Sequence, residues 1–491
     1  MIDLTINESL LERTVARAKE RDIIIPTFRQ MQHPEEIPEK IKNRLNNIGL
    51  WDINSTNLFR ITWKNEPKKS GGLFGGVNYI ELPPALTGVE ARIVALVGKW
   101  FPTGCHKVGA SFGCLAPRLV TGQFDPTYHK AVWPSTGNYC RGGAYNSQLL
   151  ACDSIAILPA EMSRERFEWL AEVAGEVIAT PGCESDVKEI FDKTWELRNT
   201  RDNVVIFNQF EELGNCLWHY HVTGHAIADL LKKIMREGDN FAGACFTSGS
   251  AGTLSSGDYL KEIYPGAKLA VGEALQCPTI LNNGFGAHRI EGIGDKHVPW
   301  VHNVKNTDMV IAIDDNDSVN LMRLFNEPAG REYLINEAGV DPDVVNNLDL
   351  LGISGISNVL CAIKFAKYYE LTEKDIVVTV LTDSMELYGS RLTEMREGSG
   401  QYSAVKASAD FERRLLGQRA DSMEELTYVA RKRVHNLKYY TWVEQQGKTV
   451  EDLNAQWYDY DNYWRAMHDQ VTQIDELINS FNERAGLLSK L

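Results

Sequence analysis

Short apolar segments alternate with longer amphipathic segments along most of the chain after Gly113. The short segments are rich in Val, Ile and Ala, which is typical of buried strands, whereas the longer ones repeat apolar residues three and four apart, as helices do. Continuous apolar strands separated by helices predict a largely parallel sheet that is covered on both faces. We expect strands at 131–133, 154–158, 177–180, 204–207, 269–272, 309–313 and 376–381, and helices at 164–174, 186–198, 218–236, 253–263, 356–369 and 385–396.

Both ends of the chain depart from this alternation. The first 95 residues are irregular, with a predicted loop at 68–72, and suggest an extension wrapped on the core. From about Gln401 the chain becomes helical and aromatic, and we expect its aromatic side chains to be buried against the core or a second subunit. They are Trp442, Trp457, Trp464, Tyr439, Tyr440, Tyr458, Tyr460 and Tyr463. A length of 491 residues exceeds one ordinary hydrophobic core, so we expect two lobes.

Composition narrows the class of protein. The 43% hydrophobic and 24% charged residues are ordinary for a globular enzyme, and a net charge of -15 argues against nucleic acid or an anionic membrane as the main partner. Nine cysteines, odd in number and without a C-x-x-C pair, indicate reduced thiols. The N-terminal residues lack a signal-peptide pattern and the apolar segments are too short to span a bilayer, so we expect a cytoplasmic protein.

Three segments carry candidate chemistry. Lys107 opens an apolar segment behind a Pro/Gly turn, although most of the 51 Lys and Arg residues must be solvated surface charges. Ser135–Thr136–Gly137–Asn138 and Thr247–Thr253 are polar turns with glycine, each between a predicted strand and a predicted helix. In parallel sheets, ligands bind where strands end and helices begin, so these segments are candidates for one site.

Each turn also has a structural interpretation. Gly249, Ser250, Ala251, Gly252 and Thr253 precede a helix, where free backbone amides favour a phosphate, but a tight turn between strand and helix explains them equally well. Ser, Thr and Asn near 135–138 are also favoured helix caps. The cluster His219, His221 and His225 lacks a completing ligand pattern, so we expect no metal. No G-x-S-x-G motif with a plausible triad is present, which disfavours a serine hydrolase.

The order and spacing of these motifs resemble the fold type II pyridoxal-phosphate enzymes, the cysteine synthase and tryptophan synthase β superfamily. Thr103–Val108 is similar to the lysine motif of tryptophan synthase β, while Ser135–Tyr139 is similar to the asparagine loop of cysteine synthase. The resemblance covers roughly residues 50 to 395. Further matches to the cysteine synthase side are Asn208–Phe210, Ala270–Glu273, Gly286–Gly294, Leu351–Gly355 and Thr382–Ser384.

The resemblance implies a role for each matching residue. Lys107 would hold pyridoxal 5'-phosphate as a Schiff base and move the substrate's α-proton, and Asn138 would bind the cofactor's phenolic oxygen. The substrate carboxylate would be held by Ser135, Thr136, Gly137 and Gln209. The cofactor phosphate would lie on Gly249, Ser250, Ala251, Gly252 and Thr253, and Ser384 would meet the pyridine nitrogen. Burial of a lysine lowers its pKa, which suits both attack on an aldehyde and proton transfer.

The resemblance also implies an architecture and an activity. Residues 95–212 would form the small lobe with the lysine and the asparagine loop, and 213–400 the large lobe with the phosphate turn. Residues 1–94 would be an extension plus part of the large lobe, and 401–491 a helical, aromatic-rich extension. We expect β-elimination or β-replacement on a serine- or cysteine-type amino acid through an aminoacrylate, with sulfide or a thiol as co-substrate, in a homodimer.

Three alternatives remain open at this stage. A serine/threonine-type dehydratase would release ammonia and a keto acid, and a tryptophan synthase β-like enzyme would consume indole. A catalytically silent cofactor-binding scaffold is suggested by the long termini, although intact Lys107, Asn138 and Ser384 argue against it. The chain departs from the family at the phosphate turn, which reads Gly-Ser-Ala-Gly-Thr instead of Gly-Thr-Gly-Gly-Thr, and at Tyr139 and Cys140, which replace smaller residues.

Overall fold

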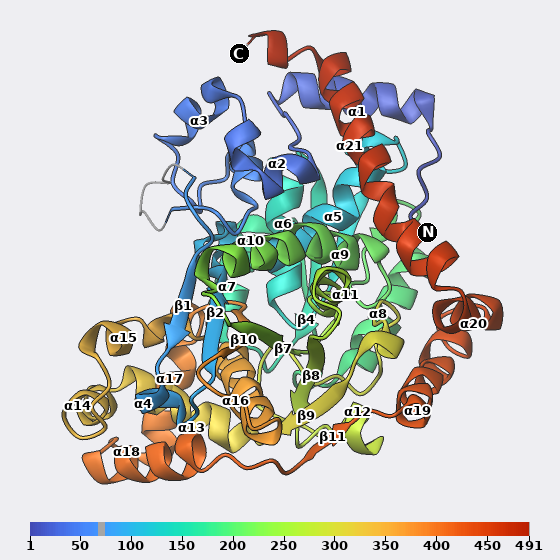
Figure 1. Ribbon diagram of the computed structural model, residues 1–491. Helices are drawn as coiled ribbons and strands as arrows, with labels where there is room; N and C mark the ends of the chain where they lie inside the picture. Colours follow the sequence, from blue (N-terminus) through green and yellow to red (C-terminus); the bar gives the residue numbers. More distant parts are fainter. Residues whose placement is uncertain (67–73, 491) are drawn as a thin grey trace.

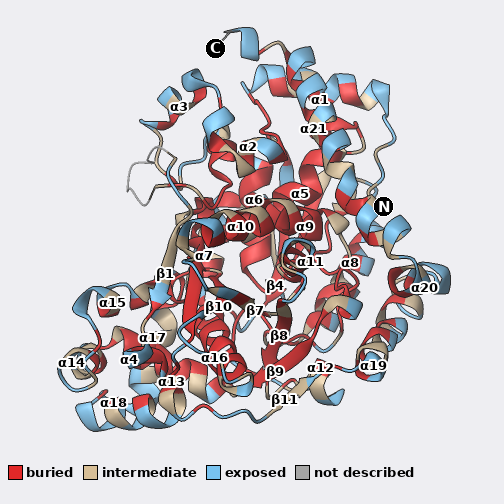
Figure 2. Cartoon of the chain, viewed as in Figure 1, coloured by how far each residue is buried: buried red, intermediate tan, exposed pale blue. Residues whose placement is uncertain are grey.

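Two sheets of mainly parallel strands organise the chain in the computed structural model, which describes residues 1–66 and 74–490 (Figure 1). The loop predicted at 68–72 lies outside the described residues. The expected two-lobed α/β architecture with a helical C-terminal region is confirmed. Strands occupy the middle of the molecule and most of their residues are buried, while exposed residues concentrate on the outer helices (Figure 2).

Within the described residues the larger sheet has seven strands, and its five central strands are parallel. The outer strands β1 and β11 pair antiparallel with β2 and β9. In spatial order the strands are β1 (Tyr79–Leu82), β2 (Arg92–Val97), β10 (Asp375–Leu381), β7 (Asn240–Thr247), β8 (Lys268–Ala274), β9 (Met309–Ile313) and β11 (Met423–Glu425).

The smaller sheet has four strands, all parallel, which come from a single stretch of the chain. In spatial order they are β5 (Glu176–Thr180), β4 (Asp153–Pro159), β3 (Lys130–Pro134) and β6 (Val204–Ile206). Helices α6 (Asn138–Leu149) and α8 (Val187–Thr200) pack on these strands. Each sheet therefore brings the carboxyl ends of several parallel strands to one edge, as a ligand site requires.

The remaining helices cover the sheets and both ends of the chain. A π-helical segment, His219–Thr223, joins α9 to α10. The helices not yet named are α1 (Glu8–Glu20), α2 (Phe28–Gln32), α3 (Glu39–Leu45), α4 (Pro84–Thr87), α5 (Lys107–Val120), α7 (Arg164–Val173), α9 (Leu213–Trp218), α10 (Gly224–Ile234), α11 (Leu254–Ile263), α12 (Thr279–Asn282), α13 (Asp315–Asn326), α14 (Pro328–Asn336), α15 (Pro342–Asn346), α16 (Ile353–Tyr368), α17 (Gly389–Ser399), α18 (Ala404–Asp410), α19 (Tyr428–Lys438), α20 (Val450–Tyr458) and α21 (Ala466–Ala485).

Strand β2 shows why its sequence reads as a continuous apolar run. Successive side chains of a strand point to opposite faces. Val94 and Leu96 belong to the core that includes α5, α10 and α21, whereas Ile93 and Ala95 belong to the core under α13 and α16. Both faces of the large sheet are therefore buried, and an apolar residue is needed at every position.

The C-terminal extension is held to both halves of the molecule. Its strand β11 adds to the edge of the large sheet beside β9, and α21 then packs against α1 and α5 near the N-terminal residues (Figure 1). The three tryptophans expected to be buried are indeed buried within this chain. Tyr440 and Tyr458 instead remain 59% and 67% exposed.

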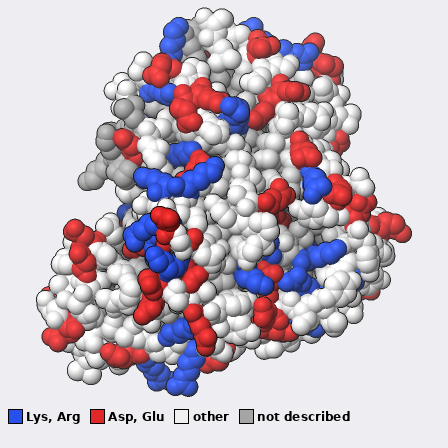
Figure 3. Space-filling model, in the orientation of Figure 1, with Lys and Arg blue, Asp and Glu red and all other residues white. Residues whose placement is uncertain are grey.

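The surface mixes charges of both signs. On the face shown in Figure 3, Lys and Arg side chains lie among Asp and Glu side chains, without a large region of one sign. The net charge of -15 gives no long-range attraction for a polyanion. Among the described residues, no helix combines the length and the apolar character needed to cross a bilayer.

Candidate active site

Lys107 begins α5, after a turn in which Thr103 and Gly104 adopt left-handed backbone conformations with φ of 70° and 68°. Its Nζ donates to Gln209 Oε1 at 3.0 Å and to Ser250 Oγ at 3.2 Å. Burial lowers the pKa of Lys107, because the ammonium loses its hydration, although nearby acidic groups oppose this effect. The amine is therefore shifted toward the neutral form that a nucleophile or base needs.

The Ser135–Asn138 turn connects β3 to α6. Gly137 has φ of 151°, and a Cβ there would lie 2.6 Å from Arg166 Nη1, so only glycine fits this close approach. Gly137 is the N-cap residue of α6, and no side chain caps the helix. Ser135 Oγ instead accepts hydrogen bonds from Gly137 N and Gln209 Nε2. The Ser135 hydroxyl therefore stabilises the turn and binds Gln209, and it does not cap α6.

The glycine turn connects β7 to α11 and places small residues where neighbouring groups approach closely. A Cβ at Gly249 would lie 2.4 Å from Gly292 O, and one at Gly252 would lie 2.2 Å from Asn215 Oδ1. Ala251 adopts φ of 63°, a left-handed conformation that costs a residue with a Cβ about 1 kcal/mol or more. The turn therefore imposes on Ala251 a backbone conformation that glycine usually adopts.

Asp383 and Ser384 follow β10 and face the asparagine turn. Asp383 Oδ2 accepts from Asn138 Nδ2 at 2.6 Å and from Tyr388 Oη at 2.7 Å. Burial raises the pKa of Asp383, with the Arg166 charge opposing that shift. Ser384 Oγ and Asn138 Oδ1 are buried without a hydrogen-bond partner among the described residues. A buried polar atom without a partner is costly, so both atoms are suited to a ligand.

One small cavity joins most of these residues. It measures about 20 Å³ and therefore must widen before it admits a ligand larger than a water molecule. The predicted residues Gly137, Ala251, Gly252, Thr253 and Ser384 do not line it. The predicted residues that do line it are Lys107, Ser135, Thr136, Asn138, Gln209, Gly249 and Ser250.

Sequence reasoning missed two buried acids beside the lysine. Asp295 lines the same cavity, and burial raises its pKa to about 7; its Oδ2 has no hydrogen-bond partner among the described residues. Burial likewise raises the pKa of Glu184 to about 8. The sequence did contain one indication of Asp295, because the charged residues Asp295 and Lys296 directly follow the Gly292–Gly294 motif. Glu184 lies in an unremarkable turn after β5 and left no such signal.

Arg166 is a third residue that the sequence did not mark. It is fully buried, with Nη1 2.6 Å from Glu291 Oε2 and 3.1 Å from Thr136 O, and its Nη2 donates to Tyr388 Oη. These contacts tie the asparagine turn of the small sheet to segments that follow strands of the large sheet. Arg166 is thus a positioning residue of the site.

The bulky residues near the turn have packing roles. Tyr139 is buried, donates from Oη to Cys114 Sγ at 3.4 Å, and meets Trp133 edge to face. Burial raises the pKa of Cys105 and of Cys140 to about 12. These thiols are protonated at neutral pH, which disfavours them as nucleophiles.

Comparison with known proteins adds a family to this geometry. The chain matches no protein-family model. It is 26% identical over 323 residues to cystathionine beta-synthase of Saccharomyces cerevisiae, covering 64% of this chain and 60% of that protein. It is 28% identical over 317 residues to cysteine synthase of Staphylococcus aureus, covering 64% of this chain and 93% of that protein. The chain is therefore similar to cystathionine beta-synthases and cysteine synthases over about two thirds of its length.

A solved structure shares the fold of this chain. A hydrogen sulfide-producing enzyme of Fusobacterium nucleatum, crystallised with an α-aminoacrylate intermediate, superposes with a TM-score of 0.56. The two are 22% identical, and the match covers 72% of this chain and 91% of that one.

Proposed function

We propose that this chain holds pyridoxal 5'-phosphate on Lys107 and catalyses β-elimination or β-replacement on a serine- or cysteine-type amino acid. The observation that carries this proposal is the meeting of Lys107, the asparagine turn, Gln209 and the glycine turn around one cavity at the carboxyl ends of parallel strands. A family relationship to cysteine synthases and cystathionine beta-synthases supports it.

The chemical groups of the site match those of pyridoxal 5'-phosphate. The Gly249–Thr253 turn and the N-terminus of α11 offer backbone amides to a phosphate, and Cβ atoms at Gly249 or Gly252 would be blocked. The unpartnered Ser384 Oγ can donate to a ring nitrogen, whereas Asn138 would meet the phenolic oxygen through its amide nitrogen, which now donates to Asp383. Lys107 must leave Ser250 when the cavity widens, because its amine now lies against that turn.

The cofactor, when bound, would withdraw electrons from the substrate's Cα. The chain's own residues would do the rest. Lys107 Nζ would bind the cofactor aldehyde and later take the proton from Cα, with its lowered pKa favouring both tasks. Ser135, Thr136, Gly137 and Gln209 would hold the substrate carboxylate. Ser384 would meet the pyridine nitrogen through a neutral hydroxyl.

Asp295 is the residue we add to the family-derived set. Burial raises its pKa to about 7, so near neutral pH its carboxyl is poised to give or take a proton. Asp295 lines the cavity together with Lys107, and its Oδ2 has no hydrogen-bond partner among the described residues. We infer that Asp295 handles the proton of the leaving group or of the incoming nucleophile.

The decisive experiment is spectroscopic. Purified protein incubated with pyridoxal phosphate should show a Schiff-base absorbance band, which Lys107→Ala should abolish. Lys99→Ala is the matched control, because Lys99 lies in the same connection between β2 and α5. An absent band in the wild type, or a lysine adduct that persists in Lys107→Ala, would refute the proposal.

The same band reports the substrates. Addition of L-serine, O-acetyl-L-serine or L-cysteine one at a time should change the spectrum with the true first substrate. Sulfide, a thiol or indole added next should restore the original band if the enzyme performs replacement. Release of ammonia and a keto acid without a second substrate would identify elimination.

We also propose that the protein works in the cytoplasm as a homodimer. The nine cysteines are free and eight are buried, which suits a reducing compartment. Exposed apolar side chains on the C-terminal extension, among them Val429 at 75% and Tyr458 at 67%, suit a subunit contact. Light scattering coupled to size-exclusion chromatography should give twice the chain mass of 55.2 kDa.

A further inference from the structure

Glu184 lies between the candidate active site and a second cavity, which we call the interlobe cavity. This cavity measures about 670 Å³, and its walls come from the segments after β4 and β5 and from α13 and α17. Glu184 lines it although the residue is only 1% exposed. On its other side the Glu184 carboxyl interacts with the side-chain hydroxyl of Thr136, a residue that lines the small cavity together with Lys107. Glu184 therefore connects the interlobe cavity to a residue of the proposed substrate site.

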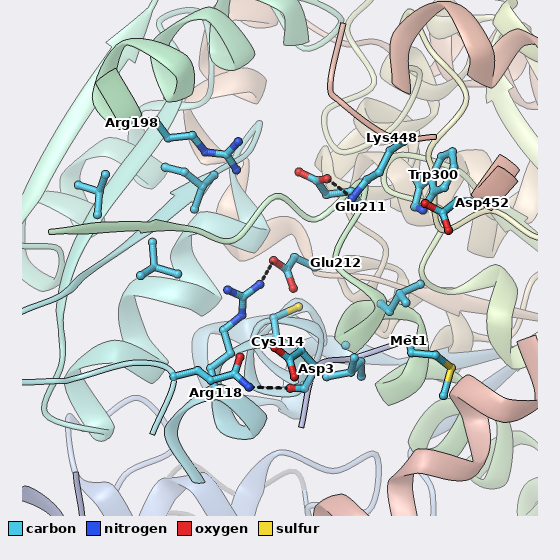
Figure 4. A pocket seen from close by; sticks show the side chains of 18 of the residues that line it. Met1, Asp3, Cys114, Arg118, Arg198, Glu211, Glu212, Trp300, Lys448 and Asp452 are labelled. Atoms are coloured by element: carbon cyan, nitrogen blue, oxygen red, sulfur yellow. Dashed lines mark hydrogen bonds and ion pairs between the residues drawn. The ribbon is translucent and has the colours of Figure 1, made fainter. Parts of the chain in front are cut away.

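The Glu184 carboxyl is buried with an oxygen that has no partner. Its Oε2 receives no hydrogen bond from any described residue. Two glutamates that border another cavity, of about 710 Å³, are paired instead: Arg118 Nη2 lies 2.6 Å from Glu212 Oε1, and Lys448 Nζ lies 2.7 Å from Glu211 Oε2 (Figure 4). A buried polar atom without a partner is costly, so Glu184 calls for an explanation that the ion pairs of the other cavity do not need.

The surroundings of Glu184 favour its protonated form. Burial raises the pKa of Glu184 to about 8, and the nearby carboxyls of Asp295 and Glu291 add to this rise. Arg166 opposes the rise, but its guanidinium already pairs with Glu291 over 2.6 Å. On the active-site side, burial lowers the pKa of Lys107, and the Glu184 charge is among the groups that oppose this effect.

The other titratable groups in the wall of the interlobe cavity do not neutralise Glu184. Its basic residues are already bound to other groups: Arg289 to Asp315, Arg391 to Glu291 and Glu394, and His288 to Gly294 O and Ile290 N. The remaining acidic groups, Glu161 and Cys183, carry no positive charge. The charge of Glu184 therefore follows the pH and is not fixed by a cation of its own.

The protonation state of Glu184 decides what the Thr136 hydroxyl can do. A hydroxyl has one hydrogen to donate and can also accept hydrogen bonds. An ionised carboxylate only accepts, so it binds the hydrogen of Thr136. A protonated carboxyl can instead donate to the Thr136 oxygen, which leaves the hydrogen of Thr136 free for another acceptor.

This inference rests on the function proposed above, in which Ser135, Thr136, Gly137 and Gln209 hold the substrate carboxylate. We propose that Glu184 is a positioning residue for that carboxylate, acting through the Thr136 hydroxyl. In its neutral form Glu184 donates to Thr136 Oγ1 and leaves the Thr136 hydrogen for the substrate. In its ionised form it binds that hydrogen itself, so the amino acid binds less tightly.

Equilibrium titration of the cofactor-loaded protein with L-alanine tests this proposal, because L-alanine has the carboxylate but no leaving group at Cβ. The Schiff-base absorbance reports its binding. Glu184→Gln, whose amide donates at any pH, should bind L-alanine as the wild type does at pH 6.5. At pH 9.5 it should bind about ten-fold more tightly than the wild type, as the loss of one charge-assisted hydrogen bond predicts. Ethylamine, which lacks the carboxylate, should bind both proteins equally at both pH values.

Two further variants separate the hydroxyl from the charge. In a Thr136→Val background, Glu184→Gln should no longer change the affinity for L-alanine at pH 9.5. An effect that persists without the hydroxyl would assign it to charge alone and overturn the proposal. Glu161→Gln is the matched control, because Glu161 lines the same cavity but is exposed, and it should bind L-alanine as the wild type does.

The proton on Glu184 can be measured without cofactor. The infrared difference spectrum between the wild type and Glu184→Gln should contain the carbonyl stretch of a protonated carboxyl at pH 6.5, and this band should be lost by pH 9.5. Thermal unfolding checks that each variant keeps its fold. A missing Schiff-base band in the loaded wild type refutes the proposed function and this proposal together. A normal Schiff-base band refutes this proposal alone if the infrared band is absent, or if the wild type and Glu184→Gln bind L-alanine equally at pH 9.5.

Discussion

Asn138 donates its side-chain amide to Asp383 Oδ2 over 2.6 Å, which links the turn after β3 of the small sheet to the end of β10 in the large sheet. Tyr388 donates to the same oxygen. One buried carboxylate oxygen therefore holds two donors from different parts of the chain. The other oxygen, Oδ1, packs against Gly352, where a Cβ would lie only 1.8 Å away.

Asp383→Ala should destabilise the protein by about 2–4 kcal/mol, because it leaves two buried donors without an acceptor. Asp383→Asn is nearly the same size and keeps an oxygen that accepts from both donors, so it should cost less than about 1 kcal/mol. Thermal unfolding of the two variants without added ligand measures the difference. Equal losses would show that the acceptor is not what stabilises this junction.

The lowered pKa of Lys107 should be visible in its reactivity. Burial shifts this pKa below the ordinary lysine value of 10.5, so the neutral amine accumulates at lower pH than in an unperturbed lysine. Trace acetylation at a series of pH values, followed by peptide mass spectrometry, should give a half-point for Lys107 below 10.5. A half-point at or above that value would contradict the role given to burial.

The sequence predicted the fold class and the positions of the main site segments. Lys107, Asn138 and Gly249 were expected at junctions of strands and helices, and each lies at such a junction. These predictions succeeded because buried parallel strands and glycine turns leave local patterns in a chain. Helix and strand periodicity depends on neighbours within a few residues, which a single sequence displays.

Contacts between residues far apart in the chain, and the burial that they produce, could not be predicted from the sequence. Arg166 and Glu291 lie 125 positions apart in the chain and form a buried ion pair under the asparagine turn. The raised pKa of Asp295 arises from burial, which the neighbouring residues of the sequence do not reveal. The hydrogen bond from the Asn138 amide to Asp383, 245 positions later in the chain, likewise depends on the fold.

The contributions of Asp295 and Glu184 to stability should fall as the pH rises through the acid-to-neutral range. Buried histidines such as His106 and His297, whose pKa burial lowers to about 3, contribute in the opposite direction. Burial raises the pKa of Asp295 to about 7 and of Glu184 to about 8, from ordinary values of 3.8 and 4.5. Between the ordinary and the raised values the folded state binds more protons than the unfolded state, so each group costs stability as pH increases. Unfolding midpoints at pH 5 and pH 8 measure this effect.

Asp295→Asn and Glu184→Gln should each shift the change in unfolding midpoint between pH 5 and pH 8 upward relative to the wild type, since an amide does not ionise. Asp341→Asn is a suitable control, because Asp341 caps a short exposed helix far from the cavity. Asp295→Asn and Glu184→Gln variants whose change in midpoint from pH 5 to pH 8 equals that of the wild type would contradict the two raised pKa values.

Ala251 offers a test of backbone strain in the glycine turn. Its φ of 63° is unfavourable for alanine, so Ala251→Gly should relieve about 1 kcal/mol of strain while adding a similar entropy cost to folding. We expect a change within about 0.5 kcal/mol. Ala362→Gly, in the buried middle of α16, should instead cost about 1 kcal/mol or more, since glycine there has no strain to relieve. Thermal unfolding of both variants compares them, and equal destabilisation would mean that the turn does not impose the left-handed conformation on residue 251.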